Sequence, residues 1–232
     1  METLNILALA LGAAWASGIN LYAAVLLLGG LGTAGAIDLP ADLEILSHPA
    51  VLAAAAGLYL VEFVADKVPG VDSAWDGLHS FIRIPAGALL AAGVVAPYGR
   101  EAEVVLALLA GGAVAAASHA TKASGRVAIN TSPEPFSNWI VSLLEDVLVI
   151  GGLILALFNP VWFLILFGLF ILMVLWLLPK LWRLLRKLFG GMRRAAEPGR
   201  RGFKLDFGQL RKPPAEGPSS AGKLPGSGGR SG

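Results

Sequence analysis

The 232-residue chain contains no cysteine. This absence excludes disulfides, thiol nucleophiles, thiolate metal sites and iron–sulfur clusters. Charge is also scarce, because Asp, Glu, Lys and Arg make up 15% of the chain, whereas soluble domains contain about 25% charged residues. Phosphatase, protease and Walker-type motifs are missing as well. The composition therefore argues against a soluble domain and carries no catalytic signature.

Long apolar runs take the place of these features, since 56% of the residues are hydrophobic. Several runs approach the roughly 20 residues that a helix needs to cross a bilayer. We therefore expect an all-α polytopic membrane protein with about six transmembrane helices. The expected spans are residues 3–32, 49–67, 84–99, 103–126, 135–158 and 160–179. The first run is too long for one upright crossing and carries Ser17 and Asn20 near its middle, so it either tilts strongly or breaks there.

The charges are distributed very unevenly along the chain. Residues 180–232 carry 13 Lys or Arg and 3 Asp or Glu, whereas residues 1–179 carry 5 and 13. Basic segments next to spans stay in the cytoplasm. We therefore expect a multi-pass protein of the cell inner (cytoplasmic) membrane with both termini cytoplasmic. Four further bases then lie at the cytoplasmic face: Lys67, Arg83, Lys122 and Arg126.

The basic C-terminal region divides into two parts. Residues 180–194 have the pattern of a basic amphipathic juxtamembrane segment, and residues 195–232 have the composition of a disordered basic tail. Besides the lipid bilayer itself, the partners expected for this region are anionic lipids, because surface attraction to lipid explains the charge more simply than nucleic-acid binding does. Six spans are few for a permease, so a homo-oligomer remains open.

A charged interval follows the second span. Asp72, Asp76, His79 and Arg83 fall at i, i+4, i+7 and i+11, which places them on one face of a helix. We predict a short amphipathic helix over residues 71–82 that is interfacial or re-entrant. The polar face can simply be solvated, with its charges complementing the helix dipole. Alternatively, Asp72, Asp76 and His79 bind a divalent metal; no other cofactor is evident.

A second polar face lies on the fourth span. His119, Lys122 and Arg126 fall at i, i+3 and i+7 and share one side of that helix. The expected topology brings this face to the same side of the membrane as Asp76. The two clusters can then meet, either as a structural ion-pair network or as the walls of a polar site. Two asparagines nearby in the sequence add uncharged donors and acceptors: Asn130 and Asn138.

Several polar residues lie within the spans themselves. Glu145 is ten residues into the fifth span, which corresponds to a depth of about 15 Å. A carboxylate at that depth costs several kcal/mol and usually marks a functional site, although a neutral or helix-paired carboxyl explains it too. Asp146 points about 100° away, toward a neighbouring helix. Glu62, about five residues inside the second span, and Asn20 of the first span complete the candidates for a pathway with Glu145 and Asp146, whereas Asp66, at the cytoplasmic end of the second span, belongs to the candidates for the cytoplasmic polar site.

Three segments together resemble a known family. They are "ASGINLY" (16–22), "EFVADKVPGVDSAWDGLHSFIRIPAGA" (62–88) and "NTSPEPFSN" followed by "ED" (130–146). The chain resembles, over about residues 5–155, the bacterial integral membrane family catalogued as domain of unknown function 4126. The resemblance implies an integral membrane protein and no particular activity.

Three functions remain open. The sequence favours a small permease or channel for an ion or small solute, with Glu145, Glu62 and Asn20 along its path. The first alternative is a membrane enzyme at the cytoplasmic interface that acts on a lipid or phosphate-bearing substrate and uses Asp72, Asp76 and His79, with or without a metal. The second alternative is a non-catalytic membrane scaffold.

Overall fold

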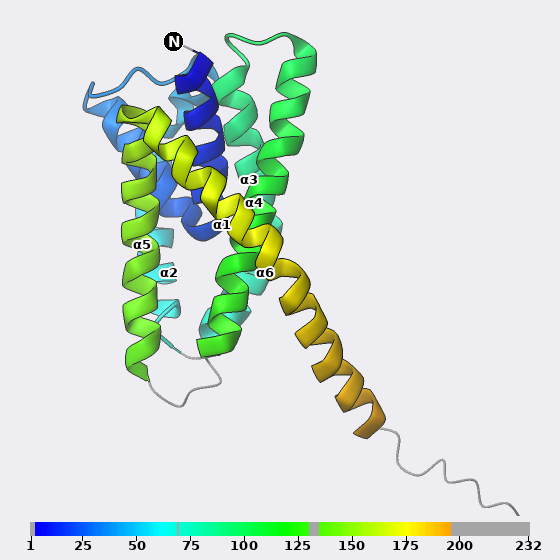
Figure 1. Ribbon diagram of the computed structural model, residues 1–232. Helices are drawn as coiled ribbons and strands as arrows, with labels where there is room; N and C mark the ends of the chain where they lie inside the picture. Colours follow the sequence, from blue (N-terminus) through cyan, green and yellow to red (C-terminus); the bar gives the residue numbers. More distant parts are fainter. Residues whose placement is uncertain (1–2, 69, 130–134, 196–232) are drawn as a thin grey trace, which may run out of the picture. The chain divides into compact units, whose positions relative to one another are not determined.

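The computed structural model describes residues 3–68, 70–129 and 135–195, and all of the regular structure among them is helical. In chain order the elements are α1 (Thr3–Thr33), the 3₁₀ helix η1 (Ala41–Ser47), α2 (Pro49–Ala65), α3 (Val71–Val95), α4 (Glu101–Ile129), α5 (Pro135–Phe158) and α6 (Pro160–Ala195) (Figure 1). The chain divides into two compact units, residues 1–185 and 186–232. The first unit contains the features discussed below.

The helices have the length and composition of membrane spans. Five qualify by themselves, namely α1, α3, α4, α5 and the first part of α6, and η1 with α2 forms a pair, bent by 64°, that adds a sixth. Large apolar side chains such as Phe81 and Phe136 are exposed on the outer faces, as expected where lipid replaces water. The expectation of a polytopic all-α membrane protein is confirmed.

α1 is broken near its middle. Asn20 has non-helical backbone angles, φ −145° and ψ 94°, so residues 3–19 and 21–33 form two helical halves. Among the five candidate spans α1 is the most buried. Of the two sequence-based alternatives for this long run, a tilt or a break, the structure shows the break.

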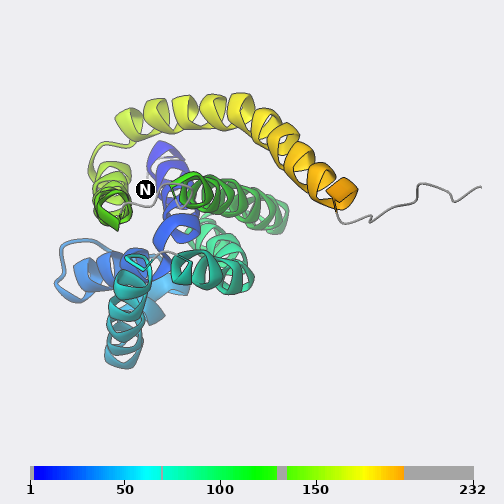
Figure 2. The same ribbon diagram turned by 90° about the horizontal axis from the view of Figure 1, so that it is seen from below.

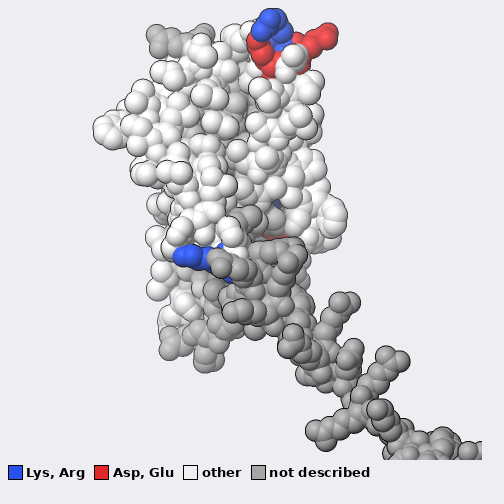
Figure 3. Space-filling model, turned by 45° about the vertical axis from the view of Figure 1, so that its right-hand side comes forward, with Lys and Arg blue, Asp and Glu red and all other residues white. Residues whose placement is uncertain are grey.

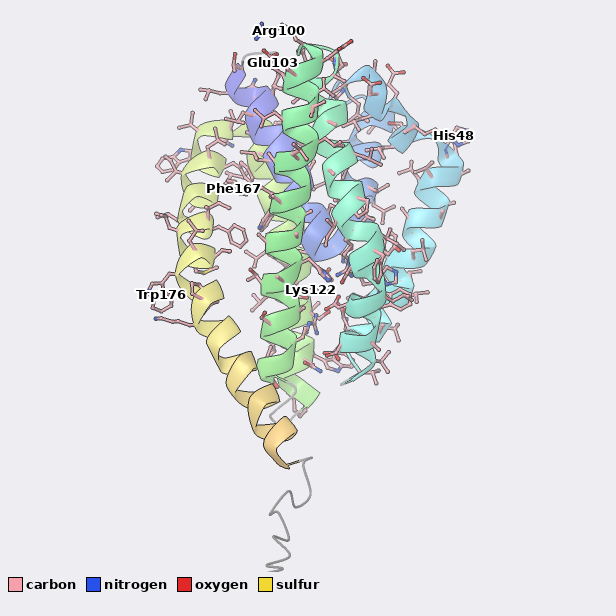
Figure 4. All side chains as sticks on the ribbon, turned by 90° about the vertical axis from the view of Figure 1, so that its right-hand side faces the viewer. His48, Arg100, Glu103, Lys122, Phe167 and Trp176 are labelled. Atoms are coloured by element: carbon pink, nitrogen blue, oxygen red, sulfur yellow. The ribbon has the colours of Figure 1, made fainter. Side chains whose placement is uncertain are left out.

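Both halves of α1 lead to the same end of the bundle. Leu9 of the first half and Leu28 of the second belong to one buried cluster, together with Leu43 of η1 and Val94 near the end of α3. Figures 1 and 4 show the first half descending into the bundle and the second half returning toward η1. The expected topology assumed that this segment crosses once. Both ends of α1 lie on the side of the loop 33–48 (Figure 1), and the expectation of two cytoplasmic termini stays a prediction.

α3 is one continuous helix from Val71 to Val95. The prediction of a short helix over 71–82, separate from a span over 84–99, is wrong, because one helix covers both. Pro85 lies inside α3 and removes one backbone hydrogen bond, but neighbouring helices in a bundle compensate for such a loss. The polar face of residues 72–83 is therefore part of a long helix inside the bundle and not an interfacial element.

The other boundaries differ less from the expected spans. α5 covers the expected range, α2 ends at Ala65, and α4 extends at both ends. α6 continues through Pro179 to Ala195, so residues 180–194 are helical. Their side chains from residue 181 onward, and the tail from residue 196, lie outside what the structure describes.

Small residues let the central helices approach closely. A Cβ at Gly111 of α4 would lie 2.5 Å from Ala91 Cβ of α3, and a Cβ at Gly87 of α3 would lie 2.5 Å from Ala115 Cβ of α4. α3 and α4 pack extensively on each other and on α1, whereas α5 packs on α1 and barely touches α4. Figure 2 shows the first part of α6 passing along the side of the bundle where α5 and α4 lie. Space for a cavity therefore exists between α4, α5 and α6.

Candidate functional site

Seven charged side chains from α2 to α5, which we call the ionic layer, form one connected network beside the break in α1. Its carboxylates are Glu62, Asp66, Asp76 and Glu145, and its cations are Arg83, Lys122 and Arg126. Glu145 is 14% exposed at its side chain, and the other six are 4% exposed or less. The two polar faces expected from the sequence do meet, and they meet deep inside the protein.

Lys122 lies at the centre of the ionic layer. Its Nζ is 3.1–3.6 Å from one oxygen of each of the four carboxylates. It also donates a hydrogen bond of 3.1 Å to the backbone carbonyl of Ile19, the last residue before the break in α1. Figure 4 shows Lys122 well below Arg100 and Glu103, which lie at the upper end of the bundle. One ammonium group thus joins α1, α2, α3 and α5 to α4.

Arg83 connects α2 and α3 within the ionic layer. Its Nη2 donates to Glu62 Oε1 at 2.6 Å, and its Nη1 donates to Asp76 Oδ1 at 2.7 Å. The backbone carbonyl of the same residue accepts a hydrogen bond of 2.8 Å from Ser17 Oγ of α1. The guanidinium is fully buried, so removal of either carboxylate partner would leave a desolvated charge incompletely paired.

Arg126 plays the corresponding role between α2 and α5. Its Nη2 donates to Asp66 Oδ2 at 3.0 Å and to Glu145 Oε2 at 2.5 Å. Its Nη1 donates at 2.7 Å to the backbone carbonyl of Asp66, which follows the last residue of α2. A cation at the C-terminal end of a helix is favoured by the helix dipole. Arg126 therefore holds the end of α2 as well as the side chain of α5.

The break in α1 is held by polar side chains of three helices. Asn20 Oδ1 accepts a hydrogen bond of 2.9 Å from the backbone N–H of Ala23, and Asn20 Nδ2 donates to Asp146 Oδ1 at 2.9 Å. Tyr59 of α2 donates to the other oxygen of Asp146 at 3.2 Å. Asn20 thus caps the second half of α1, and Asp146 faces the positive end of that half-helix.

The charges of the ionic layer do not balance. Four carboxylates stand against three cations, so the layer has a formal charge of −1 when every group is ionised. One oxygen of each of three carboxylates is buried without a hydrogen-bond partner among the described residues: Glu62 Oε2, Asp66 Oδ1 and Asp76 Oδ2. An uncompensated charge is costly inside a membrane protein. Two guanidinium nitrogens of the layer, Arg83 Nε and Arg126 Nε, also lack a partner among the described residues, so the layer combines a formal excess of one carboxylate with unpaired polar atoms of both kinds.

A cavity of about 590 Å³ adjoins the ionic layer between α1, α4, α5 and α6. Its walls are largely apolar and include four aromatic residues: Trp15, Phe163, Phe167 and Phe170. Lys122 and Glu145 are the charged residues in its wall, and Ser118 and Thr121 add two hydroxyls. Figure 3 shows that the charge visible on one face of the molecule gathers mainly at the upper edge. The cavity therefore lies between the apolar exterior of the bundle and the buried charges of the ionic layer.

The three residues predicted as metal ligands have separate partners. Asp72 Oδ1 accepts hydrogen bonds from two backbone N–H groups at the start of α3. His79 Nδ1 lies 2.9 Å from the carbonyl of Trp75, and the two rings stack at 4.1 Å. Asp76 belongs to the ionic layer. Among the residues that the structure describes, no group of three or more His, Asp or Glu is arranged to hold a metal ion.

The remaining candidates lie at the edge of the layer or outside it. His119 is buried, and its Nε2 lies 2.6 Å from Ser80 Oγ of α3. Asn138 is buried in the first turn of α5. Asn130 lies outside the described residues. His119 is not among the ion pairs that the described residues form.

Two charged residues outside the spans behave differently from the ionic layer. Lys67, just after α2, donates to the carbonyl of Phe63 at 2.8 Å, with its Nζ over the Phe63 ring; burial lowers the pKa of Lys67. At the other end of the bundle, the hydrogen bonds to Glu103 raise the pKa of Arg100. The Arg100 pair is exposed and lies far from the site, which makes it a useful control.

Tyr59 is a site residue that was not predicted from the sequence. It lies three residues before Glu62, so the two occupy the same face of α2, and this spacing was the available signal. Its partner Asp146 faces α1 and α2, as expected for a side chain directed toward a neighbouring helix. Glu145, in contrast, faces α4 and the cavity.

Comparison with known proteins places the chain in a family. No curated protein and no solved structure gives a significant match. A family model described as Domain of unknown function (DUF4126) matches residues 7–180, a range that contains the break in α1, the whole ionic layer and the cavity lining. The resemblance seen in the sequence is confirmed, and the chain belongs to the family described as Domain of unknown function (DUF4126).

Proposed function

We propose that this membrane protein is a proton-linked permease in which Glu145 exchanges a proton next to the cavity. The observation that carries the proposal is the imbalance of the ionic layer, four buried carboxylates against three cations beside a broken helix. Transporters commonly bind substrates and coupling ions where helices break within the bundle, because half-helix ends present partial charges there.

The imbalance favours a proton as the coupling ion. A proton on one carboxylate brings the layer to formal neutrality. A metal ion would need several converging oxygen or nitrogen ligands, and the described part of the chain has no such group. The carboxylate oxygens that lack partners, on Glu62, Asp66 and Asp76, offer further positions for a proton in the layer.

Glu145 is the member through which the proton enters and leaves. It is the most exposed of the seven and the one carboxylate in the cavity wall. Charged groups face it from two helices: Arg126 at 2.5 Å and Lys122 at 3.6 Å on α4, and Asp66 of α2 through its shared contacts with both. α1 and α6 contribute apolar side chains around it, including Trp15 and Phe167.

Protonation of Glu145 would change the contacts between helices. The ion pairs that the structure shows for α5 all come from Glu145, and both go to α4. A neutral Glu145 weakens this link, while Asp146 still ties α5 to Asn20 and Tyr59. α5 can then separate from α4 at the cavity without losing its contact with α1. Such a switch between two contact states couples proton binding to the opening of the cavity.

The alternative of an interfacial enzyme has less geometric support. Its proposed groups Asp72, Asp76 and His79 each have their own partners, and Asp76 is buried. General acid–base or metal chemistry at the interface needs groups that a substrate can reach.

The test is a pH-jump measurement on reconstituted protein. We expect the wild type in proteoliposomes on a solid-supported membrane to give a transient current when external pH is stepped, because protons bind and move charge. Glu145→Gln, which cannot exchange a proton, should abolish it. Glu103→Gln at the far end of the bundle should leave it intact. A wild-type current in folded Glu145→Gln would show that the proton site is elsewhere and overturn the proposal.

A further inference from the structure

We infer that the cavity binds a lipophilic organic cation, with an apolar and preferably aromatic body among the aromatic residues and one positive charge at Glu145. The inference rests on the proposed function, since it names the substrate class of the same permease. It is argued from the shape of the cavity and from the hydrogen-bond partners of the polar groups in its wall. The proposed proton site does not account for these features.

The charge of the ionic layer selects the sign of the ligand. With every group ionised the layer has an excess of one carboxylate, so a cation beside Glu145 completes the balance that a proton otherwise provides. An anionic headgroup would instead add a second uncompensated negative charge, which is unfavourable in a low-dielectric site. Proton and organic cation therefore compete for the same position, as exchange transport requires.

Among the polar groups of the wall, the indole N–H of Trp15 is a buried donor without a hydrogen-bond partner among the described residues, and it is uncharged; the other donors are engaged. Lys122 already contacts four carboxylates and the Ile19 carbonyl. The hydroxyls of Ser118 and Thr121 donate to backbone carbonyls of their own helix. The carboxylate of Glu145 thus remains as the charged group that a ligand in the cavity can approach.

The cavity itself suits an aromatic or bulky apolar body. Its volume of about 590 Å³ falls within the roughly 300–1,000 Å³ that small-molecule sites occupy. Phe163 and Phe167 stack at 5.6 Å between ring centroids, and Trp15 meets Phe170 edge to face at 6.2 Å. Aromatic faces attract cations as well as apolar groups. The aromatic residues of the cavity therefore suit the apolar body of a positively charged amphiphile, and Glu145 suits its charge.

Gly151 offers a position at which a larger side chain would fill the cavity. Gly151 of α5 lines it, and a Cβ added there would meet no atom within 4 Å among the described residues. Leucine at residue 151 therefore projects into the cavity and leaves Glu145 in place. Gly57 of α2 is equally open and does not line the cavity, so Gly57→Leu is a matched control for the added bulk.

The experiment uses two probes of nearly the same size and shape and opposite charge, tetraphenylphosphonium and tetraphenylborate. Equilibrium dialysis of purified protein in detergent should show saturable binding of the phosphonium and none of the borate. Binding should weaken as pH falls, because protonated Glu145 no longer attracts the cation. In weakly buffered solution, each cation that displaces a proton should release one proton to the solvent.

The variants locate the binding. Glu145→Gln should bind the phosphonium about 30-fold more weakly, since one partner of a charge pair is lost, and should release no protons. Gly151→Leu should weaken binding to a similar extent while the pH-jump current persists. Gly57→Leu should bind like the wild type. If Glu145→Gln does not fold, Gly151→Leu still decides the location.

The outcomes separate this inference from the proposed function. Equal binding of the borate, or phosphonium binding that neither Glu145→Gln nor Gly151→Leu weakens, overturns the inference. A Glu145-dependent pH-jump current without phosphonium binding also refutes the substrate class, and the permease stands. If phosphonium binds at Glu145 but neither a pH-jump current nor pH-driven uptake is observed, the inferred binding site stands and the proposed permease function is refuted.

Discussion

Replacement of Arg83 by methionine tests whether the ionic layer acts as one coupled unit. Arg83 is fully buried and donates to Glu62 and Asp76 at 2.6 and 2.7 Å. Its removal leaves four carboxylates against two cations, with Asp76 held by Lys122 at 3.5 Å. Breaking a buried ion pair by removing one partner costs about 3–5 kcal/mol. We expect Arg83→Met to lose that much free energy of unfolding near neutral pH, and less in acid, where a carboxylate can be protonated.

The double variant Glu62→Gln/Arg83→Met makes the prediction quantitative. It leaves three carboxylates against two cations, which restores the wild-type excess of one. We expect it to recover about 1–3 kcal/mol relative to the sum of the single variants, the coupling typical of residues in one network. Unfolding can be followed by the fluorescence of the 6 tryptophans during titration with sodium dodecyl sulfate.

The exposed pair at the upper end of the bundle supplies the control. Arg100 contacts Glu103 at 2.7 Å with 87% of its side chain exposed, so Arg100→Met should leave stability unchanged within error. Two results would refute the reasoning: an Arg83→Met variant as stable as Arg100→Met, or a double variant whose loss equals the sum of the single losses.

Two further predictions concern the break in α1. Gly18→Ala should cost about 1–3 kcal/mol through overpacking, because the new Cβ would overlap Ser118 Oγ and the Ala115 carbonyl; the unfolding titration should show no comparable loss in the open-site control Gly57→Ala. Asn20→Asp should destabilise at neutral pH, since it sets a second carboxylate against Asp146, and the same titration should show recovery in acid as one of the two is protonated. A loss that is independent of pH would contradict this account.

Helical periodicity allowed part of the site to be predicted. The spacing of Asp76 and Arg83 on one helix, and of Lys122 and Arg126 on another, identified two faces, and the structure brings these faces together. The same spacing does not bring Asp72 and His79 into a common site with Asp76, because a shared face does not determine the partner of each side chain. Asp72 accepts hydrogen bonds from backbone N–H groups at the start of α3, and His79 stacks on Trp75 of its own helix and meets Tyr22 of α1 edge to face.

The course of α1 could be predicted only in part. Polar residues in the middle of a long apolar run indicated a tilt or a break, but either outcome fits the composition. The direction of the second half depends on partners far along the chain, namely Lys122 at Ile19 and Asp146 at Asn20. The continuity of α3 through Pro85 was missed for a related reason, since proline usually ends a helix and only the surrounding bundle permits it here.

The break in α1 also has a consequence for the order in which the chain assembles. The side chains that hydrogen-bond to the break are synthesised late: Lys122 follows Ile19 by 103 residues, and Asp146 follows Asn20 by 126 residues. At about 5–20 residues per second, a ribosome needs roughly 6–25 s to make that interval. Until Asp146 has been made, the break in α1 lacks the carboxylate that binds Asn20, so α1 reaches its final form only after this part of α5 has been synthesised.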